Sequence, residues 1–368
     1  MNKIKSFWGS VELLVATTIG AGMFSLPYIF KESGWLLGIF YMVVLGSAIV
    51  FVHRLYWLSL EKEKAKSHLL GLVETYLGRG AFYMAFLSVL GGLIFVLTAH
   101  LEIVQQFLRI AVPEADNQTA VVIFWLLASL PAFFNIRHLV QTELLGVVSI
   151  ISIILFIFFT GYGGNFFNFQ AINLNNIFLP FGAVLFSLSG WMAIEPMFEW
   201  QKNGARSKPL RALAVGTFLP AFVYILFILG ILNSASVISS DTISSLLSWP
   251  SWKLQVLGWL GILAMWNSYT PVNLEIKNEL EKDIHFSRWL SFAVPFLLPA
   301  IIFFSGFFNF LSIISLAGGV FLALQYVFII LVSKKILKLS GLRKFFSNLL
   351  ILVFLAAAIY EIYYFTLR

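Results

Sequence analysis

The sequence predicts an all-α polytopic membrane protein with eleven transmembrane helices. Ten of them are expected to form two inverted repeats of five, in which the first and sixth helices are broken. Three observations predict this class. The mean hydropathy is +0.91, with 60% of 368 residues hydrophobic and only 11% charged. The apolar residues fall in segments of membrane length, and two of these segments are interrupted by glycine and proline at matching positions.

Apolar segments long enough to cross a bilayer recur throughout the chain and are joined by short links. The expected spans are about 7–30, 34–57, 80–111, 119–135, 139–162, 176–200, 210–232, 251–273, 287–306, 308–333 and 343–366. No segment is large enough for a separate soluble domain. We therefore expect a single transmembrane domain over 1–368, with repeat one at about 7–162, repeat two at about 176–333 and an extra helix at about 343–366.

Basic residues predict the orientation of these spans. With the N-terminus inside, twenty of the 24 Lys and Arg residues fall on the inner side. The outer side keeps only Lys31, Arg109, Lys253 and Arg368. This asymmetry follows the positive-inside rule and predicts a multi-pass protein of the cytoplasmic (inner or plasma) membrane. The odd span count then places the C-terminus outside. The net charge of +7 reflects this topology, so no nucleic-acid partner is expected and the partner surface is the lipid bilayer.

Two connecting segments have structure of their own. Residues 58–78 are expected to form a charged inner loop followed by a short amphipathic helix. Residues 233–250 form a long Ser-rich outer loop, either a lid or a passive surface loop.

The first interruption lies in the middle of the first span, at TTIGAGMFSLP (17–27). Two glycines, two threonines and a proline are unfavourable in a continuous helix. A broken helix at membrane depth survives only inside protein or beside a wet cavity, because lipid cannot satisfy its backbone groups. The alternative is that Gly20 and Gly22 only permit close helix packing.

The second interruption, FSLSGWMAIEP (186–196), lies in span six and enters the membrane with the opposite polarity. Paired breaks of this kind mark transporter binding sites. Each break leaves unpaired N–H groups, which suit a carboxylate, and unpaired C=O groups, which suit an ammonium or a small cation. A zwitterion matches both, so an α-amino acid is the expected small-molecule partner. Its side chain is expected against Met23, Phe186 and Trp191.

These two motifs resemble the amino acid–polyamine–organocation superfamily of amino acid permeases, and are closest to its aromatic amino acid permeases and amino acid/auxin permeases. The segment 267–280 (NSYTPVNLEIKNEL) is similar to that superfamily's span eight. The resemblance covers spans one to ten in layout but only spans one, six and eight in motif. It implies a leucine-transporter-like fold and secondary amino acid transport by alternating access.

The resemblance also implies roles for individual residues. The substrate carboxylate would meet Thr18, Gly20, Ala21, Gly22 and Met23, and the amino group would meet Phe186, Ser187, Ser189 and Gly190. In sodium-coupled relatives, backbone carbonyls near Ala16 and Ile19 and span-eight hydroxyls, here Ser268 and Thr270, hold the ion. From span three, Thr98 or His100 could also reach the substrate, although His100 is as readily explained as a packing residue.

Three carboxylates lie in the inner halves of their spans, Glu12, Glu143 and Glu195. Charged groups at membrane depth are functional candidates by default, and a buried carboxylate could carry a coupled proton. We rank Glu12 first because it is deepest. The alternative is that these carboxylates lie near the headgroups and pair with Arg137, Arg206 or Lys208.

The sequence therefore predicts a proton- or sodium-coupled amino acid symporter with no cofactor beyond the co-transported ion. It contains no cysteine, HExxH motif, Walker A loop or GxSxG elbow, so a catalytic metal site and a primary pump are not expected. An integral-membrane enzyme acting on a lipid-linked substrate is the alternative function. The sequence does not indicate the oligomeric state.

Overall fold

The computed structural model describes residues 3–63, 68–134, 143–161, 169–202, 208–235, 237–282 and 284–366. In these ranges every regular element is a helix. The long helices are α3 (Trp35–Glu63), α5 (Arg79–Ala111), α6 (Asn117–Phe134), α7 (Glu143–Thr160), α10 (Pro209–Ser234), α11 (Ser251–Lys282), α12 (Arg288–Ser305) and α15 (Gly341–Thr366).

The first apolar segment is broken at the expected place. Helix α1 (Lys3–Thr18) ends two residues before a short 3₁₀ turn, η1 (Ala21–Ser25), which leads into α2 (Leu26–Ser33). The two halves are bent by 53°. Pro27 fits the first turn of α2, where no backbone N–H is needed, and Gly34 ends that helix with a φ of 96° that favours glycine.

The sixth expected span is broken as well. Helix α8 (Pro180–Leu188) stops where Ser189 adopts an extended conformation, and a 3₁₀ turn, η5 (Trp191–Ala193), precedes α9 (Ile194–Lys202). Each break therefore has a half-helix on either side. The two broken segments touch each other through α8 and η1 and through α1 and η5.

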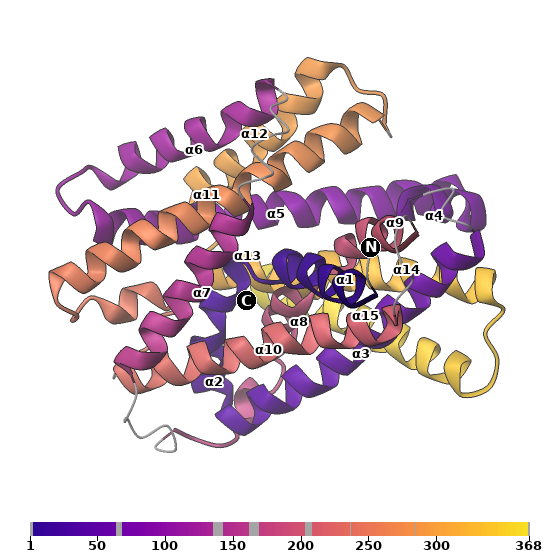
Figure 1. Cartoon of the computed structure of the whole chain (residues 1–368), viewed down its shortest axis with the longest axis horizontal. Coiled ribbons are helices and arrows are strands. Elements are labelled where there is room, and N and C mark those ends of the chain that lie inside the picture. Colours follow the sequence, from indigo (N-terminus) through magenta and orange to yellow (C-terminus); the bar gives the residue numbers. More distant parts are fainter. Residues whose placement is uncertain are drawn as a thin grey trace.

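The remaining helices surround these two breaks. Helices α3, α5, α10 and α11 extend along the long axis of the molecule, and α4 (Leu69–Leu77) lies near the end where α3 finishes (Figure 1). Helix α1 packs on α10, while α5 packs on α11 and α12. The short helix expected within 58–78 is α4, but α3 continues as a helix to Glu63, where a charged loop was expected, and residues 64–67 lie outside the described residues.

The expected tenth span contains an irregular turn. Helix α13 (Phe310–Leu316) passes into a π-helix, η7 (Ala317–Leu322), before α14 (Ala323–Leu337) continues. The sequence pattern did not indicate this turn. Single π turns inside α-helices occur frequently at functional sites. Here the turn packs against α8, α5 and α15.

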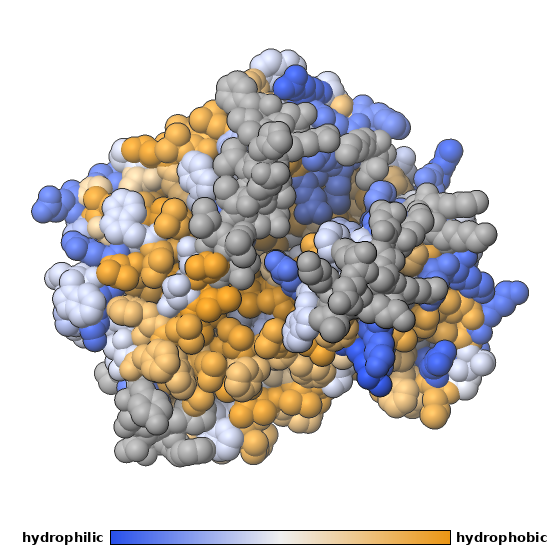
Figure 2. Space-filling view, viewed as in Figure 1, coloured by the Kyte–Doolittle hydropathy of each residue, from blue (hydrophilic) through white to orange (hydrophobic). Residues whose placement is uncertain are grey.

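The outer surface has the hydrophobic character of a membrane protein. Large apolar side chains are exposed on many helices, including Phe40, Leu87, Phe159, Phe222 and Ile359. Figure 2 shows hydrophobic residues over a broad central area of one face, with hydrophilic residues toward its margins. In water such a patch would be unfavourable, so this surface suits lipid.

By length and composition, seven helices in the described ranges could cross a membrane, or eight when the bent pair Ser6–Thr18 and Ala21–Ser33 counts as one span. The eleven expected spans are thus not all recovered by this measure. The three expected spans that this measure leaves out are 119–135, 139–162 and 251–273. They correspond to α6 and α7, which contain only shorter apolar stretches, and to α11, whose final turns are charged.

The described part of the Ser-rich segment before α11, residues 237–250, is docked onto the protein. Its 3₁₀ turn η6 (Ile243–Leu246) buries Ile243 and Leu246. The Thr242 hydroxyl donates a hydrogen bond to the carbonyl oxygen of Phe24 in the first broken segment. Of the two sequence-based interpretations of this segment, these contacts favour the lid over the passive surface loop.

Candidate functional site

A cavity of about 290 Å³ lies between the two helix breaks. Its walls come from α1, η1, α8 and η5, completed by α5, α7, α11, η7 and α14. Thirteen of the residues expected at the site line it: Ala16, Thr18, Ile19, Gly20, Ala21, Gly22, His100, Phe186, Ser187, Ser189, Gly190, Trp191 and Ser268. The tertiary structure therefore brings the two sequence motifs and span eight together at one cavity.

Three of the expected uncharged residues lie elsewhere. Met23 is fully buried in the core beside the cavity rather than in its lining. Thr98 is also fully buried and donates its hydroxyl to the carbonyl of Ile94, 2.9 Å away on its own helix. The Thr270 hydroxyl donates to the carbonyl oxygen of Ala128 on α6 at 3.1 Å.

The backbone at the first break offers N–H groups to the cavity. Gly20 precedes the 3₁₀ turn η1 in an extended conformation, and no side chain caps that turn. The N–H of Met23 makes only a long bond, 3.4 Å, to the carbonyl of Gly20. The first N–H groups of a helical turn have no partner within the turn and carry partial positive charge. Ala21 and Gly22 are therefore suited to meeting an anionic group in the cavity.

Glycine allows the two breaks to approach each other. A Cβ atom on Gly22 would lie 2.5 Å from the ring of Phe186, and one on Gly190 would lie 2.5 Å from the Thr18 hydroxyl. At Gly20, by contrast, a Cβ would meet no atom within 4 Å. Gly22 and Gly190 are thus close-packing glycines, whereas Gly20 leaves open space at the cavity wall. Close packing therefore explains Gly22, whereas it gives no reason for a glycine at position 20.

Tyr224 of α10 forms hydrogen bonds to both helix breaks. Its buried hydroxyl lies 2.8 Å from the carbonyl oxygen of Thr18 and 3.1 Å from that of Ser187. Both carbonyls are at the ends of half-helices, where the next helical N–H is missing. A single phenol thus provides a donor for two orphan acceptors.

Sequence reasoning missed Gln325 on α14, which lines the cavity and is 3% exposed. Its Oε1 accepts a 2.7 Å hydrogen bond from the indole Nε1–H of Trp191, and its Nε2 donates to the Ser88 carbonyl at 2.8 Å. The amide therefore fixes Trp191 against α5. The available signal was that Gln325 is a lone amide in an apolar membrane segment.

Two acceptor atoms beside the cavity have no hydrogen-bond partner within the described residues, His100 Nε2 and Asn267 Oδ1. His100 Nδ1 lies 2.7 Å from the carbonyl oxygen of Val96, which can only accept. In neutral His100 the proton is thus on Nδ1, and Nε2 is an acceptor. Buried polar atoms normally have partners, so these two acceptors suit a bound ammonium or cation.

The cavity is closed at one end. Phe24, Phe107 and Phe227 are fully buried and in edge-to-face contact beyond the first break, with ring centroids 5.4 and 5.6 Å apart. The lining also includes Thr17, next to the end of α1, and Glu275 of α11, which are both exposed. The cavity is therefore accessible at these two residues.

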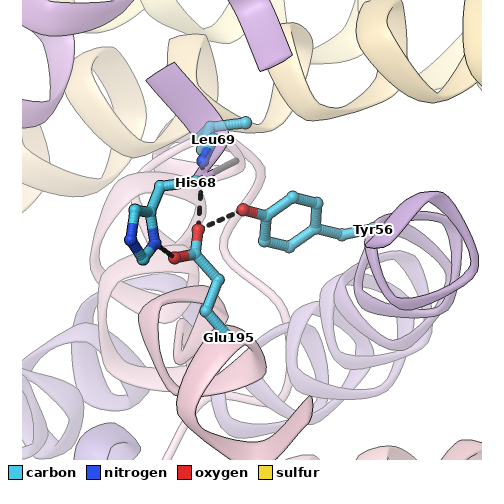
Figure 3. A network of polar contacts seen from close by, with 4 residues as sticks. All are labelled: Tyr56, His68, Leu69 and Glu195. Atoms are coloured by element: carbon cyan, nitrogen blue, oxygen red, sulfur yellow. Dashed lines mark hydrogen bonds and ion pairs between the residues drawn. The ribbon is translucent and has the colours of Figure 1, made fainter. Parts of the chain in front are cut away.

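None of the three expected carboxylates contributes to the described cavity wall. Glu12 is exposed on α1, and the side chain of Glu143 lies outside the described residues. Glu195, at the start of α9, instead accepts hydrogen bonds from Tyr56 of α3 and from the backbone N–H of Leu69 (3.1 Å) and contacts His68 (Figure 3). Glu195 therefore has partners on α3 and at α4. Of the expected basic partners, Arg137 and Arg206 lie outside the described residues.

A helical membrane protein with a small cavity between two broken helices is of the class of secondary transporters. The profile of the family described as "Transmembrane amino acid transporter protein" matches residues 3–231, and the chain belongs to this family. It is a transmembrane amino acid transporter of the leucine-transporter-like fold, and not an enzyme. A comparison with curated proteins finds no match.

Solved structures support this fold. The structure titled "Crystal structure of MhsT in complex with L-phenylalanine" matches with a TM-score of 0.67 at 13% identity, covering 96% of this chain and 97% of that one. A manganese transporter from Eremococcus coleocola, in complex with an aromatic bis-isothiourea substituted compound, matches with a TM-score of 0.66 at 13% identity. That match covers 98% of this chain and 88% of the transporter. At this identity the likeness concerns the fold alone.

Proposed function

We propose that this transporter is a cation-coupled symporter of neutral α-amino acids, with its substrate site in the cavity between the two breaks. The observation that carries the proposal is the convergence of Gly20, Ala21 and Gly22 with Phe186 and Trp191 around one small cavity. The family and the fold give the transported class, while the arrangement of the cavity supports the binding mode.

The substrate carboxylate lies at the uncapped N–H groups of Ala21 and Gly22, because these carry the partial positive charge of a helix start. The ammonium group faces the unpaired acceptors Asn267 Oδ1 and His100 Nε2 and the hydroxyl of Ser187. Thr18, Ser189 and Gly190 shape the wall between these two ends, rather than meeting the charged groups directly as the resemblance implied.

The substrate is a single, neutral amino acid with a large side chain. The cavity of about 290 Å³ is at the small end of ligand sites, which suits one amino acid better than a peptide. Glu275 is the only Asp, Glu, Lys or Arg residue in the described lining, and its side chain is exposed. Phe186 and Trp191 provide an apolar surface, and the similar structure of MhsT was solved in complex with L-phenylalanine.

The topology is that of eleven spans, with α6, α7 and α11 crossing the bilayer together with the eight more apolar segments. Residues 7–162 and 176–333 form the two inverted halves, and α15 is added at the end. The N-terminus lies in the cytoplasm, as the distribution of basic residues indicates. The exposed Thr17 and Glu275 then mark an inward-facing opening of a cytoplasmic-membrane protein.

The coupled ion is a proton or a sodium ion. Ala16, Ile19 and Ser268 line the cavity and remain candidates for a sodium site, but the Thr270 hydroxyl is already bonded to α6. Glu12 and Glu195 lie away from the described lining, so neither contacts a cavity substrate directly.

Uptake into proteoliposomes tests this function. Purified protein is reconstituted and supplied with labelled phenylalanine, leucine, glutamate or lysine under a sodium gradient, a proton gradient or neither. We expect accumulation of the large neutral amino acids and not of the charged ones. Counterflow without any gradient separates transport from coupling. Absence of both uptake and counterflow for every amino acid would disprove the proposal.

A further inference from the structure

Helix α15 carries a buried carboxylate that the substrate site does not use. Most of this helix is apolar and exposed, with Leu352, Ile359 and Tyr363 on the surface. Glu361 is only 1% exposed and points into the bundle on the same side as the buried Phe354 and Ala358. A carboxylate held inside a membrane helix bundle is costly, so its position requires a specific reason.

Two glycines make room for this carboxylate. A Cβ on Gly319 of the π-helix η7 would lie 2.3 Å from Glu361 Cγ, and one on Gly182 of α8 would lie 2.6 Å from Glu361 Oε1. The N–H of Gly182 donates a hydrogen bond to the same oxygen at 3.2 Å. Glu361 therefore occupies a recess that the backbones of α8 and η7 leave open only because these two residues have no side chain.

The recess has one donor for the ionised carboxylate and acceptors for the protonated one. The donor is the N–H of Gly182 in the first turn of α8, where the positive end of the helix dipole favours an anion. The Ser315 carbonyl oxygen lies on the same side of Gly182, 2.5 Å from the position of its missing Cβ. The Ser315 hydroxyl is fully buried and has no hydrogen-bond partner within the described residues.

No cation neutralises Glu361 in the described surroundings. The elements α8, α13 and η7 contain no charged residue. Tyr41 of α3 has an electrostatic interaction with Glu361. On α14, Tyr326 packs its ring against Phe354, and the last turn holds Lys334 and Lys335, of which Lys334 bonds to Asn348. The charge of Glu361 is therefore determined by proton uptake rather than by an ion pair.

The recess is directly connected to the cavity. Gly182 lies one helical turn before Phe186, and Ala317 and Leu322 of the π-helix line the cavity beside it. A Cβ on Gly318 would lie 1.9 Å from the Gly182 carbonyl oxygen and 2.9 Å from Phe186 Cβ. A change in the packing of Gly182 against η7 would therefore shift the two cavity walls that α8 and η7 form, with no direct contact between Glu361 and the substrate.

We propose that Glu361 is the proton-binding group of this transporter, and that its protonation outside the substrate cavity biases the position of half-helix α8. A proton from water adds to the ionised carboxylate, and the resulting O–H donates to an acceptor on Ser315. The interaction between the negative charge and the start of α8 is then lost, which loosens the contact of α8 with α15 and η7. Glu361 is a positioning residue, because it acts on the site through α8. The inference rests on the proposed function as an amino acid symporter.

The test uses the full-length protein in proteoliposomes, with labelled phenylalanine and a series of imposed pH gradients. For one coupled proton, each pH unit of gradient changes the accumulation ratio by about tenfold, since one unit corresponds to about 1.4 kcal/mol. We expect this slope in the wild-type protein. Glu361→Gln, which keeps the shape of the protonated carboxyl, should lose the slope while phenylalanine counterflow continues. Gly319→Ala, which displaces the carboxylate, should have the same effect.

Glu12→Gln tests the competing assignment, because Glu12 ranks first among the sequence-based proton carriers but is exposed on α1, away from the described cavity wall. It should keep the slope. A normal slope in Glu361→Gln, or counterflow lost together with thermal stability, would overturn the inference. Accumulation driven by sodium alone in the wild-type protein would also overturn it, while leaving the symporter proposal intact. Absence of wild-type counterflow would instead contradict the proposed function itself.

Discussion

The hydroxyl of Tyr224 lies 2.8 Å from the carbonyl oxygen of Thr18, at the point where the first broken helix stops. The same hydroxyl lies 3.1 Å from the Ser187 carbonyl in the second broken helix. One side chain on α10 therefore holds the ends of two half-helices that face the cavity. Since alternating access requires the broken helices to move relative to their surroundings, this bond stabilises one arrangement of them.

Tyr224→Phe removes this donor and leaves two buried carbonyl oxygens without it. We expect a loss of about 1–3 kcal/mol in stability and a lower transport rate, with the protein still folded. Thermal unfolding in detergent and phenylalanine counterflow measure the two effects. Tyr83→Phe is the control, because Tyr83 is exposed on α5 and lies away from the described cavity wall. Equal effects of the two substitutions would contradict the bridging role.

Gly20→Leu should weaken substrate binding without disrupting the fold, because a side chain at Gly20 enters open space beside the cavity. A bulky group there occupies the expected carboxylate position. Substrate-dependent thermal stabilisation is the measurement, since a ligand that binds only the folded state raises the melting temperature. Gly80→Leu is the matched control, since Gly80 also has open space but lies at the start of α5. Normal phenylalanine stabilisation in Gly20→Leu would exclude the carboxylate site proposed here.

Gln325→Leu should raise the KM for substrate more than it lowers the maximal rate. The substitution leaves the Trp191 indole N–H without its 2.7 Å partner, so the indole no longer has one fixed position in the cavity wall. Unpaired buried donors cost about 1–3 kcal/mol, equivalent to at least a several-fold loss of affinity if expressed in binding. The matched control is Gln201→Leu, which removes a buried amide that bonds to Ser10 away from the described cavity wall. An unchanged KM in Gln325→Leu would show that Trp191 does not need this support.

The bond between Tyr56 and Glu195 should contribute to stability more than a similar bond at the surface. Tyr56 is fully buried, and the carboxylate also accepts from the backbone of Leu69. A double-mutant cycle with Tyr56→Phe and Glu195→Gln is expected to give a coupling of about 1–2 kcal/mol, at the lower end for bonds to charged groups because Glu195 is partly exposed.

The control for that cycle is the bond between Tyr76 and Glu63, at 2.7 Å on the surface of α4 and α3. Its coupling should be smaller because water competes for both groups. If the two cycles give equal couplings, the network around Glu195 has no special role in holding α4 against α9.

Acid should weaken the start of α6. The backbone N–H of Thr119 and its hydroxyl hold the pKa of Asp116 below its usual value, because both donate to the carboxylate. A lowered folded-state pKa contributes stability above the unfolded pKa, and this contribution is lost as the pH falls through the folded value. Melting temperatures measured as the pH falls from about 5 to 2 should therefore drop less steeply in Asp116→Asn than in the wild-type protein. Identical slopes would contradict this assignment.

The sequence alone determined the class of the protein and the positions of the two helix breaks. Hydropathy and the glycine and proline residues near 20 and 190 located two breaks because lipid tolerates irregular backbone only beside protein or a cavity. The matching spacing of the two breaks predicted one shared site, and in the structure thirteen of the expected residues line a single cavity. Glycine and proline affect the backbone at their own positions, so the sequence itself indicates where each helix breaks.

Tertiary structure decided which side chains the breaks meet. Gln325, Tyr224 and Glu361 lie on helices distant in sequence, and their roles depend on the rotation of each helix, which an apolar sequence without clear periodicity does not indicate. The same rotation exposes Glu12 and keeps Thr98 out of the described cavity wall, against expectation. The residues that break a helix lie at the break itself and can be recognised in the sequence. The side chains that contact the break come from distant helices, and only the packing of those helices brings them there.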